Sequence, residues 1–95
     1  MPQSLSNILV HLIFSTRLRY PYIDKKIIKE LHHYMVGIIR TYDVFVHEIG
    51  GIEDHVHILI SLPRVLTISK LVEELKKGSS KWIKTKEIQY EKFAW

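Results

Sequence analysis

An alternating run from His55 to Leu62 places the tightest constraint on how this chain can fold. Successive side chains of a β-strand point to opposite faces, so the run predicts a strand with one apolar face and one mixed face. The apolar face consists of Val56, Ile58 and Ile60. The mixed face consists of His55, His57, Leu59 and Ser61. Pro63 follows at once and ends the strand, because proline has no backbone N–H to donate.

Two strands and a helix are predicted before this run. Ser4–Ser15 is apolar on both faces, which is typical of a central strand covered on both sides. Asp24 is a candidate N-cap for a helix from Lys25 to about Thr41. Val44–Ile49 is rich in β-branched and aromatic residues and predicts another strand. Gly50-Gly51 predicts the opening of a tight turn that runs through Asp54. The apolar stripe of the helix is formed by Ile27, Ile28, Leu31, Tyr34, Met35, Ile38 and Tyr42.

A second helix and the start of a further strand are predicted after Pro63. The helix begins near Thr67 or Ser69, and Gly78 either ends it or lies inside a helix that continues through Ile83. Phe93–Trp95 is the predicted start of a fourth strand.

The resulting order, β-α-β-β-α-(β), predicts a single α+β domain over residues 1–95. Two βαβ-type halves around a central hairpin describe a ferredoxin-like sandwich, in which both helices lie on one face of an antiparallel sheet. A chain of this size buries roughly 60–70 % of the surface that its unfolded form exposes, which allows a modest core.

Composition narrows the class of protein. The chain has no cysteine, which excludes disulfides and thiolate metal sites and favours a reducing, cytoplasmic environment. It has neither the pattern of a signal peptide nor an apolar run of the ~20 residues that a membrane helix needs. A net charge of +4 favours an anionic partner such as nucleic acid.

The two histidines of the mixed face are candidate metal ligands. Residues two apart on a strand are roughly 6.5–7 Å apart along the backbone, so two imidazoles on one face are able to converge on one divalent ion. Asp54 precedes the pair and two glycines lie nearby. The simpler alternative is a pair of polar side chains on an exposed face, or two hydrogen-bonded structural histidines.

Three blocks of the sequence resemble a known family. The run Gly50–Pro63 (GGIEDHVHILISLP) resembles the HUH-motif region of the insertion-sequence-200/605 transposases and their REP-associated relatives. His11–Arg17 is similar to their first strand, and Ile68–Val72 with Leu75–Ile83 is similar to their helix after the motif. The blocks occur in the same order and cover nearly the whole chain, and the Asp-His-Val-His-Ile-Leu block is the most specific of them.

The resemblance implies a transposase that cuts single-stranded DNA at hairpin-flanked element ends through a tyrosine–phosphate intermediate. His55 and His57 match the catalytic, metal-ligating pair of the family, which binds Mg²⁺ or Mn²⁺ and polarises the scissile phosphate. The resemblance also implies a homodimer, in which the tyrosine of one subunit can serve the histidines of the other.

The nucleophile that the family requires has no match in this chain. In the family, a glycine-rich strand and a tyrosine-bearing helix follow the Phe-Ala-Trp segment, whereas this sequence ends at Trp95. We therefore expect a C-terminally incomplete chain that is inactive alone. Tyr90 matches no nucleophile position, and Tyr34 and Tyr42 lie on or beside the predicted helical stripe, where they are expected to pack.

Basic and hydroxyl side chains are candidates for contacts with DNA phosphates, and Trp82 or Trp95 is a candidate to stack on an unpaired base. A solvated helix face and packed tryptophans explain the same residues equally well. The candidate phosphate contacts are Arg17, Arg19, Lys76, Lys77, Ser79, Ser80, Lys81 and Lys84.

Other titratable residues near the predicted hairpin have less defined roles. Either His47 or Glu48 shares the face of the histidine pair, and a shift of one residue in the hairpin register exchanges them. His11 is able to face the same site from the first strand, although a structural role is favoured. His32 and His33 lie beside the stripe of the first helix, where surface or packing roles are expected.

Two alternatives to an active transposase remain open from the sequence. The first is an inactive module that binds hairpin nucleic acid and that regulates, or derives from, a full-length transposase. The second is a dimeric α+β protein whose histidines bind nothing. A reading frame that continues beyond Trp95 into a glycine-rich segment and a tyrosine-bearing helix would favour the transposase.

Overall fold

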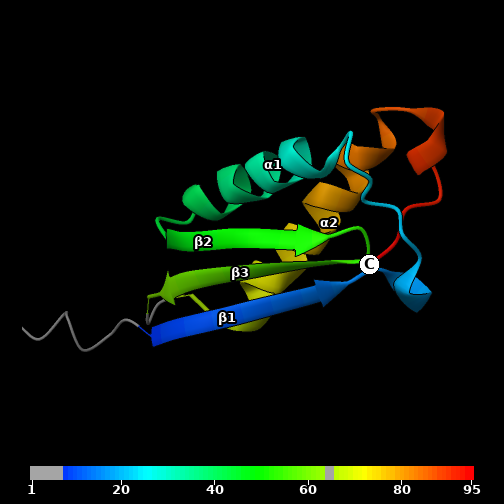
Figure 1. The fold of residues 1–95 in the computed structure, drawn as a ribbon. Coiled ribbons are helices and arrows are strands. Elements are labelled where there is room, and N and C mark those ends of the chain that lie inside the picture. Colours follow the sequence, from blue (N-terminus) through cyan, green and yellow to red (C-terminus); the bar gives the residue numbers. More distant parts are fainter. Residues whose placement is uncertain (1–7, 64–65) are drawn as a thin grey trace, which may run out of the picture.

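The computed structural model describes residues 8–63 and 66–95, which form three strands, two long helices and two short 3-10 turns (Figure 1). The predicted residues Ser4–Asn7 of the first strand lie outside the described part of the chain. The elements in chain order are β1 (Ile8–Ser15), η2 (Arg17–Arg19), α1 (Ile28–Arg40), β2 (Phe45–Ile52), β3 (His55–Leu62), α2 (Ile68–Lys84) and η3 (Ile88–Tyr90).

The three strands form an antiparallel sheet in the order β1-β3-β2, so β3 is the central strand. Its alternation holds as predicted, because Val56, Ile58 and Ile60 are fully buried while the alternate residues are partly exposed. Both helices pack on the buried face of the sheet, and Figure 1 looks onto the other face, with α2 behind the strands. We call the face without helices the open face. The α+β class and the β-α-β-β-α order are confirmed.

The prediction that the first strand is central was wrong. β1 pairs with β3 alone and lies at the edge of the sheet in the described part of the chain. Its inner residues Leu12 and Phe14 are buried, but Leu9 and Ile13 on the open face are each 64 % exposed. A strand that is apolar on both faces has the same sequence pattern whether or not a second layer covers it, so the pattern alone did not separate the two cases.

The turn predicted to open at Gly50-Gly51 and run through Asp54 is confined to its last two residues. Gly50 and Gly51 lie inside β2, opposite His57 and Val56, and the reversal of the chain comes later, at Glu53 and Asp54. Gly51 has φ 156°, and a Cβ there would clash with the backbone around His55. Glycine is required at this point by the close approach of the two strands rather than by a turn.

α1 begins three residues later than predicted. The carboxylate of Asp24 accepts hydrogen bonds from the backbone N–H groups of Lys26 and Ile27, both at 3.1 Å, so it caps the turn that leads into the helix. The helix buries Leu31 and Met35 as predicted. It also buries Ile39, which the predicted stripe omitted.

α2 starts as predicted and continues without a break through Gly78. Oγ1 of Thr67 accepts a hydrogen bond from the backbone N–H of Lys70 at 3.1 Å, which makes Thr67 the N-cap. A Cβ at Gly78 would lie 2.8 Å from Cδ1 of Ile38, so this glycine permits the close packing of α2 on α1.

The predicted fourth strand is not formed by the described residues after α2. Phe93 is buried, and the segment that contains it folds back onto η2, where the backbone N–H of Arg17 donates to the carbonyl of Ala94 at 2.9 Å. No helix in the described ranges is both long enough and apolar enough to span a bilayer.

Candidate metal centre and nucleic-acid surface

The histidine pair lies on the open face, at the beginning of the central strand. His55 and His57 have ring centroids 6.5 Å apart, and both side chains are partly exposed. Val56 between them is fully buried and anchors the backbone beneath the two rings. The pair is therefore presented to solvent by the central strand of the sheet, on the face that the alternation predicted.

His57 has a neighbour on each flanking strand. On the β2 side it lies opposite Gly50, and its ring occupies the space where a side chain would otherwise stand, since a Cβ at Gly50 would be 3.0 Å from Nε2 of His57. On the β1 side, the ring of His11 packs edge-on against it with centroids 5.4 Å apart. His11 therefore faces the same site as His57, which was one of the two roles that the sequence left open for it.

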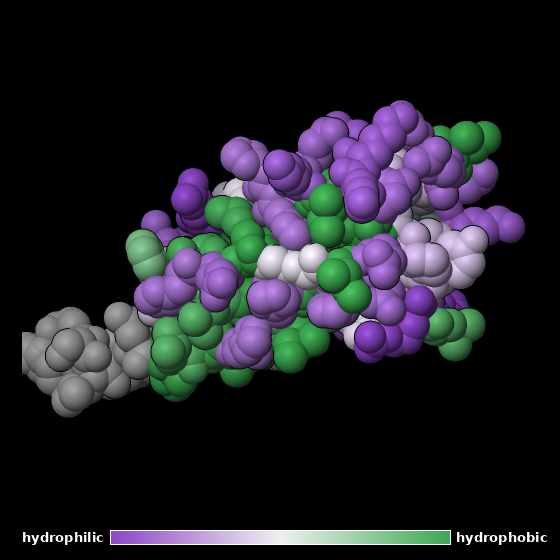
Figure 2. Space-filling view, in the orientation of Figure 1, coloured by the Kyte–Doolittle hydropathy of each residue, from purple (hydrophilic) through white to green (hydrophobic). Residues whose placement is uncertain are grey.

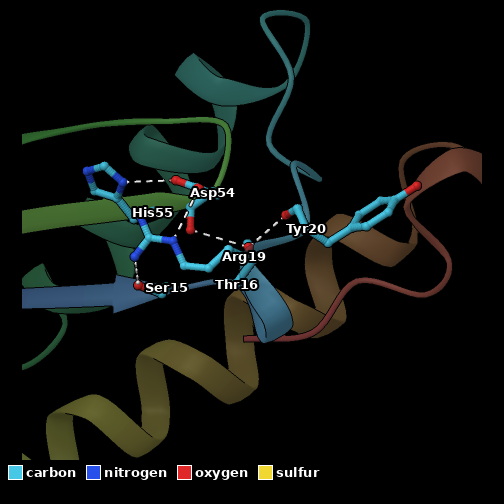
Figure 3. Close-up of polar contacts among 6 residues, drawn as sticks. All are labelled: Ser15, Thr16, Arg19, Tyr20, Asp54 and His55. Carbon is cyan, nitrogen blue, oxygen red and sulfur yellow. Dashed lines mark hydrogen bonds and ion pairs between the residues drawn. The ribbon is translucent and has the colours of Figure 1, made fainter.

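His55 is hydrogen-bonded to the residue before it. Its Nδ1 lies 3.1 Å from Oδ1 of Asp54, and the other carboxylate oxygen of Asp54 is 3.3 Å from Nε of Arg19 (Figure 3). These two partners hold the pKa of Asp54 below its ordinary value. The hydrogen bond from His55 contributes most, the charge of Arg19 adds to it, and desolvation of the carboxyl opposes both. The sequence placed Asp54 next to the pair but did not predict this hydrogen bond.

The hairpin register decides which of His47 and Glu48 shares the face of the histidine pair, a question that the sequence left open. Both side chains reach that face. A β-bulge separates Val46 from Glu48, so that Glu48 pairs with Leu59 on the open face. His47 also reaches this face, where its Nε2 lies 2.7 Å from Oγ of Ser61 at the far end of β3. In residues 8–63 and 66–95, no group of three or more histidine, aspartate or glutamate side chains is arranged to hold a metal ion.

Most of the predicted phosphate contacts from α2 line one open cleft. The cleft has a volume of about 620 Å³ and lies between α2 and the final residues of the chain. Its lining residues are Lys76, Lys77, Ser80, Lys81, Lys84, Phe93, Ala94 and Trp95. We call it the lysine cleft. Four ammonium groups on consecutive turns of one helix give it a positive potential that suits a phosphate backbone.

Three of the predicted contacts lie elsewhere. Ser79 is fully buried, donates to the carbonyl of Leu75 and accepts a hydrogen bond from Nε1 of Trp95 at 2.9 Å. Its hydroxyl is therefore engaged within the core. Arg17 and Arg19 are exposed in η2, at the end of β1, and Arg19 approaches the histidine pair through Asp54.

The two tryptophans make packing contacts. Trp82 stacks on Tyr34 of α1 with ring centroids 4.8 Å apart, and the ammonium of Lys86 lies 4.8 Å from the Trp82 ring. Trp95 packs edge-on against Phe14 and Phe93. Trp95 also lines the lysine cleft, so part of its surface remains accessible there.

Four of the tyrosines have partners away from the histidine pair. The hydroxyl of Tyr90 donates to Oδ1 of Asp24 at 2.8 Å, and burial together with that carboxylate raises the pKa of Tyr90 to about 12. Tyr34 stacks on Trp82 as a packing residue, and Tyr20 lies against Tyr22, its ring directed away from His55 in Figure 3.

A smaller pocket lies between α1 and β2, beside the histidines of the helix. It has a volume of about 330 Å³ and contains His32 and His33 together with Lys29 and Arg40. Burial lowers the pKa of His32, and the nearby His57 adds to this effect. The sequence predicted surface or packing roles for the two helical histidines and did not predict a pocket beside them.

The described residues thus form an antiparallel sheet with two helices on one face and a partly exposed His-x-His pair on its central strand. The family described as "Transposase IS200 like" matches residues 4–95, and the chain belongs to it. A search of curated proteins finds no significant match. The fold is similar to the crystal structure of a proposed transposase from Deinococcus radiodurans R1, with a TM-score of 0.82 and 19 % identity over 94 % of this chain and 72 % of that one.

Proposed function

We propose that this chain is a single-stranded DNA-binding transposase-type protein whose His55 and His57 hold a divalent metal ion. The observation that carries the proposal is the placement of both imidazoles on the open face of β3, the central strand, where both are partly exposed to solvent. Family membership supports it, because the histidines lie within the matched region.

The donor set fits a metal that completes its coordination with oxygen. Two neutral imidazoles provide nitrogen ligands, and the remaining positions would be taken by water or phosphate oxygens, which suits Mn²⁺ or Mg²⁺. When bound, such an ion withdraws charge from a scissile phosphate and orients it. The protein's own contribution is to hold His55 and His57 at fixed positions and to bring the DNA strand to them.

The lysine cleft supports nucleic acid as the partner. Lys76, Lys77, Lys81 and Lys84 line a surface on which apolar and aromatic groups also lie, a combination that suits an unpaired strand with its exposed bases. The contacts with phosphate would provide affinity without sequence specificity. Hairpin DNA with a single-stranded extension is the substrate class that we propose.

The contacts of the tyrosines favour binding without cleavage by these 95 residues. Tyr90 is hydrogen-bonded to Asp24 and its raised pKa makes it a poor nucleophile, since attack requires the phenolate. We therefore propose that the chain binds metal and DNA but does not cut the strand alone. The alternative of an inactive hairpin-binding module shares this expectation.

A homodimer is part of the proposal. Among residues 8–63 and 66–95, β1 has no partner on its outer edge, and Leu9 and Ile13 on its open face are largely exposed. Figure 2 shows apolar residues gathered on the open face where β1 begins. Apolar residues next to an unpaired strand edge favour association with another chain.

Fluorescence anisotropy with labelled DNA tests the proposed function. We expect a hairpin with a single-stranded extension to bind more tightly than a duplex of the same length, and the affinity to fall steeply with salt. Incubation with Mn²⁺ should leave the labelled strand intact on a denaturing gel. Equal affinity for hairpin and duplex, or nicking that disappears in a Tyr90→Phe variant, would contradict the proposal.

A further inference from the structure

Asp54 engages both oxygens of its carboxylate at the start of β3. Oδ1 faces Nδ1 of His55 at 3.1 Å, and Oδ2 faces Nε of Arg19 at 3.3 Å (Figure 3). An ionised carboxylate only accepts hydrogen bonds, so Nδ1 of His55 must carry the proton in this contact. A neutral imidazole with its proton on Nδ1 leaves the lone pair of Nε2 free to bind a metal.

The backbone of Asp54 is fixed by a buried residue. Its carbonyl accepts a hydrogen bond from the backbone N–H of Thr16 at 2.9 Å, and Oγ1 of the same threonine lies 3.3 Å away. Thr16 is 3 % exposed, and its hydroxyl also reaches the carbonyl of Tyr20 at 2.7 Å. The β2–β3 turn is thereby joined to the end of β1, which sets the direction of the Asp54 side chain.

Arg19 restrains the carboxylate from the other side. Its guanidinium also donates to Oγ of Ser15 at 3.3 Å, and its backbone lies in the left-handed region with φ 58°. Leu18 before it has φ 56°, so two successive non-glycine residues hold an unfavourable conformation. The side chain of Arg19 is 62 % exposed, and an ion pair so exposed contributes little to stability. The ion pair instead restrains the position of the Asp54 carboxylate.

We propose that Asp54 is a positioning residue for His55, which it holds in the tautomer and orientation that present Nε2 to a metal ion. The inference rests on the proposed function for the metal, but the state of His55 is a property of the free chain. Acidic partners of this kind fix the tautomer of ligating histidines and raise their basicity in metal sites.

Long-range ¹H–¹⁵N NMR of the imidazole nitrogens tests the tautomer without any metal. We expect His55 of the native chain to carry its proton on Nδ1. Asp54→Ala should shift the proton toward Nε2, whereas Asp54→Asn should retain the native tautomer, because its amide oxygen still accepts a hydrogen bond from Nδ1–H. A native chain with His55 protonated on Nε2 would overturn the proposal, and this result does not depend on whether any variant folds.

Manganese affinity provides the second readout, with Glu53→Ala as the matched control. Glu53 is the exposed neighbour of Asp54, so the control removes the same charge from the same turn. We expect Asp54→Ala to weaken Mn²⁺ binding by about tenfold or more relative to Glu53→Ala. Equal affinities of the two variants would overturn the positioning role. A native chain that binds no Mn²⁺ would contradict the proposed function instead, and the tautomer would still decide the role of Asp54.

Discussion

Gly50 and His57 face each other across the β2–β3 pair, and the ring of His57 fills the space that a side chain at Gly50 would need. A Cβ built on Gly50 lies 3.0 Å from Nε2 and 3.2 Å from Cε1 of His57. The position of one histidine of the candidate metal centre thus depends on the absence of a side chain at Gly50 on the neighbouring strand.

Gly50→Ala should therefore displace the His57 ring and weaken metal binding. The ring is the end of a flexible side chain, so it is able to rotate away at a cost of about 0.5–1.5 kcal/mol, equivalent to about a two- to tenfold loss of affinity. Calorimetric titration of Mn²⁺ measures the loss. The control is Gly37→Ala, where nothing lies within 4 Å of the added Cβ. An unchanged affinity in Gly50→Ala would show that the space beside His57 is not needed for binding.

Two glycines in the helices should respond oppositely to alanine. Gly37 is exposed within α1 and its replacement meets no atom, so Gly37→Ala should stabilise the protein by about 0.5–1 kcal/mol. For a domain of this size the melting temperature should rise by about 2–8 °C. In Gly78→Ala, the Cβ meets Cδ1 of Ile38 at 2.8 Å, and overpacking by about 1–3 kcal/mol outweighs the gain in helix propensity. Equal stabilisation by both substitutions, measured by thermal unfolding, would contradict the close packing of α1 and α2.

The Tyr90–Asp24 hydrogen bond should make stability fall at high pH. The pKa of Tyr90 is raised to about 12 in the folded chain, against about 10 in the unfolded chain. The contribution of the neutral hydroxyl is therefore complete below about pH 10 and is lost as the pH rises toward 12. Tyr90→Phe should lower the free energy of unfolding by about 1–3 kcal/mol at neutral pH. Urea unfolding of both proteins should show this difference shrinking above pH 10, and a difference that stays constant to pH 12 would count against the hydrogen bond.

Removing two charges from the lysine cleft should reduce the salt dependence of DNA binding. If Lys81 and Lys84 each neutralise one phosphate, the double variant Lys81→Gln/Lys84→Gln should reduce the slope of log K against log salt by about 1.4 for a single strand. Lys25→Gln/Lys29→Gln, which removes one charge just before α1 and one in its first turn, is the control with the same net charge. The cleft would not be the binding surface if both double variants changed the slope equally.

The sequence predicted the elements better than their environment. β3 was predicted with its correct bounds, because its alternation and the proline after it are local signals. The position of β1 at the edge and the inclusion of Gly50-Gly51 in β2 depend on which strand pairs with which, and neither is encoded in the residues of one strand.

In the candidate site, too, local features were predictable from the sequence and features that depend on strand pairing were not. The shared face of His55 and His57 follows from their spacing, whereas the contact of His11 with His57 requires the β1–β3 register. The bulge that brings both His47 and Glu48 to the open face disturbs the simple alternation on which their assignment depended. Ser79 was predicted from its position between lysines, but the helical period turns it inward to meet Trp95.

Titration of Mn²⁺ into the purified chain, beside the His55→Ala/His57→Ala double variant, tests the central claim most directly. Both histidines are partly exposed on the open face, so their removal should leave the fold intact, which circular dichroism would verify. The account predicts saturable binding by the native chain and its loss in the double variant. Binding of equal strength by both proteins, or by neither, would contradict the assignment of this pair as a metal centre.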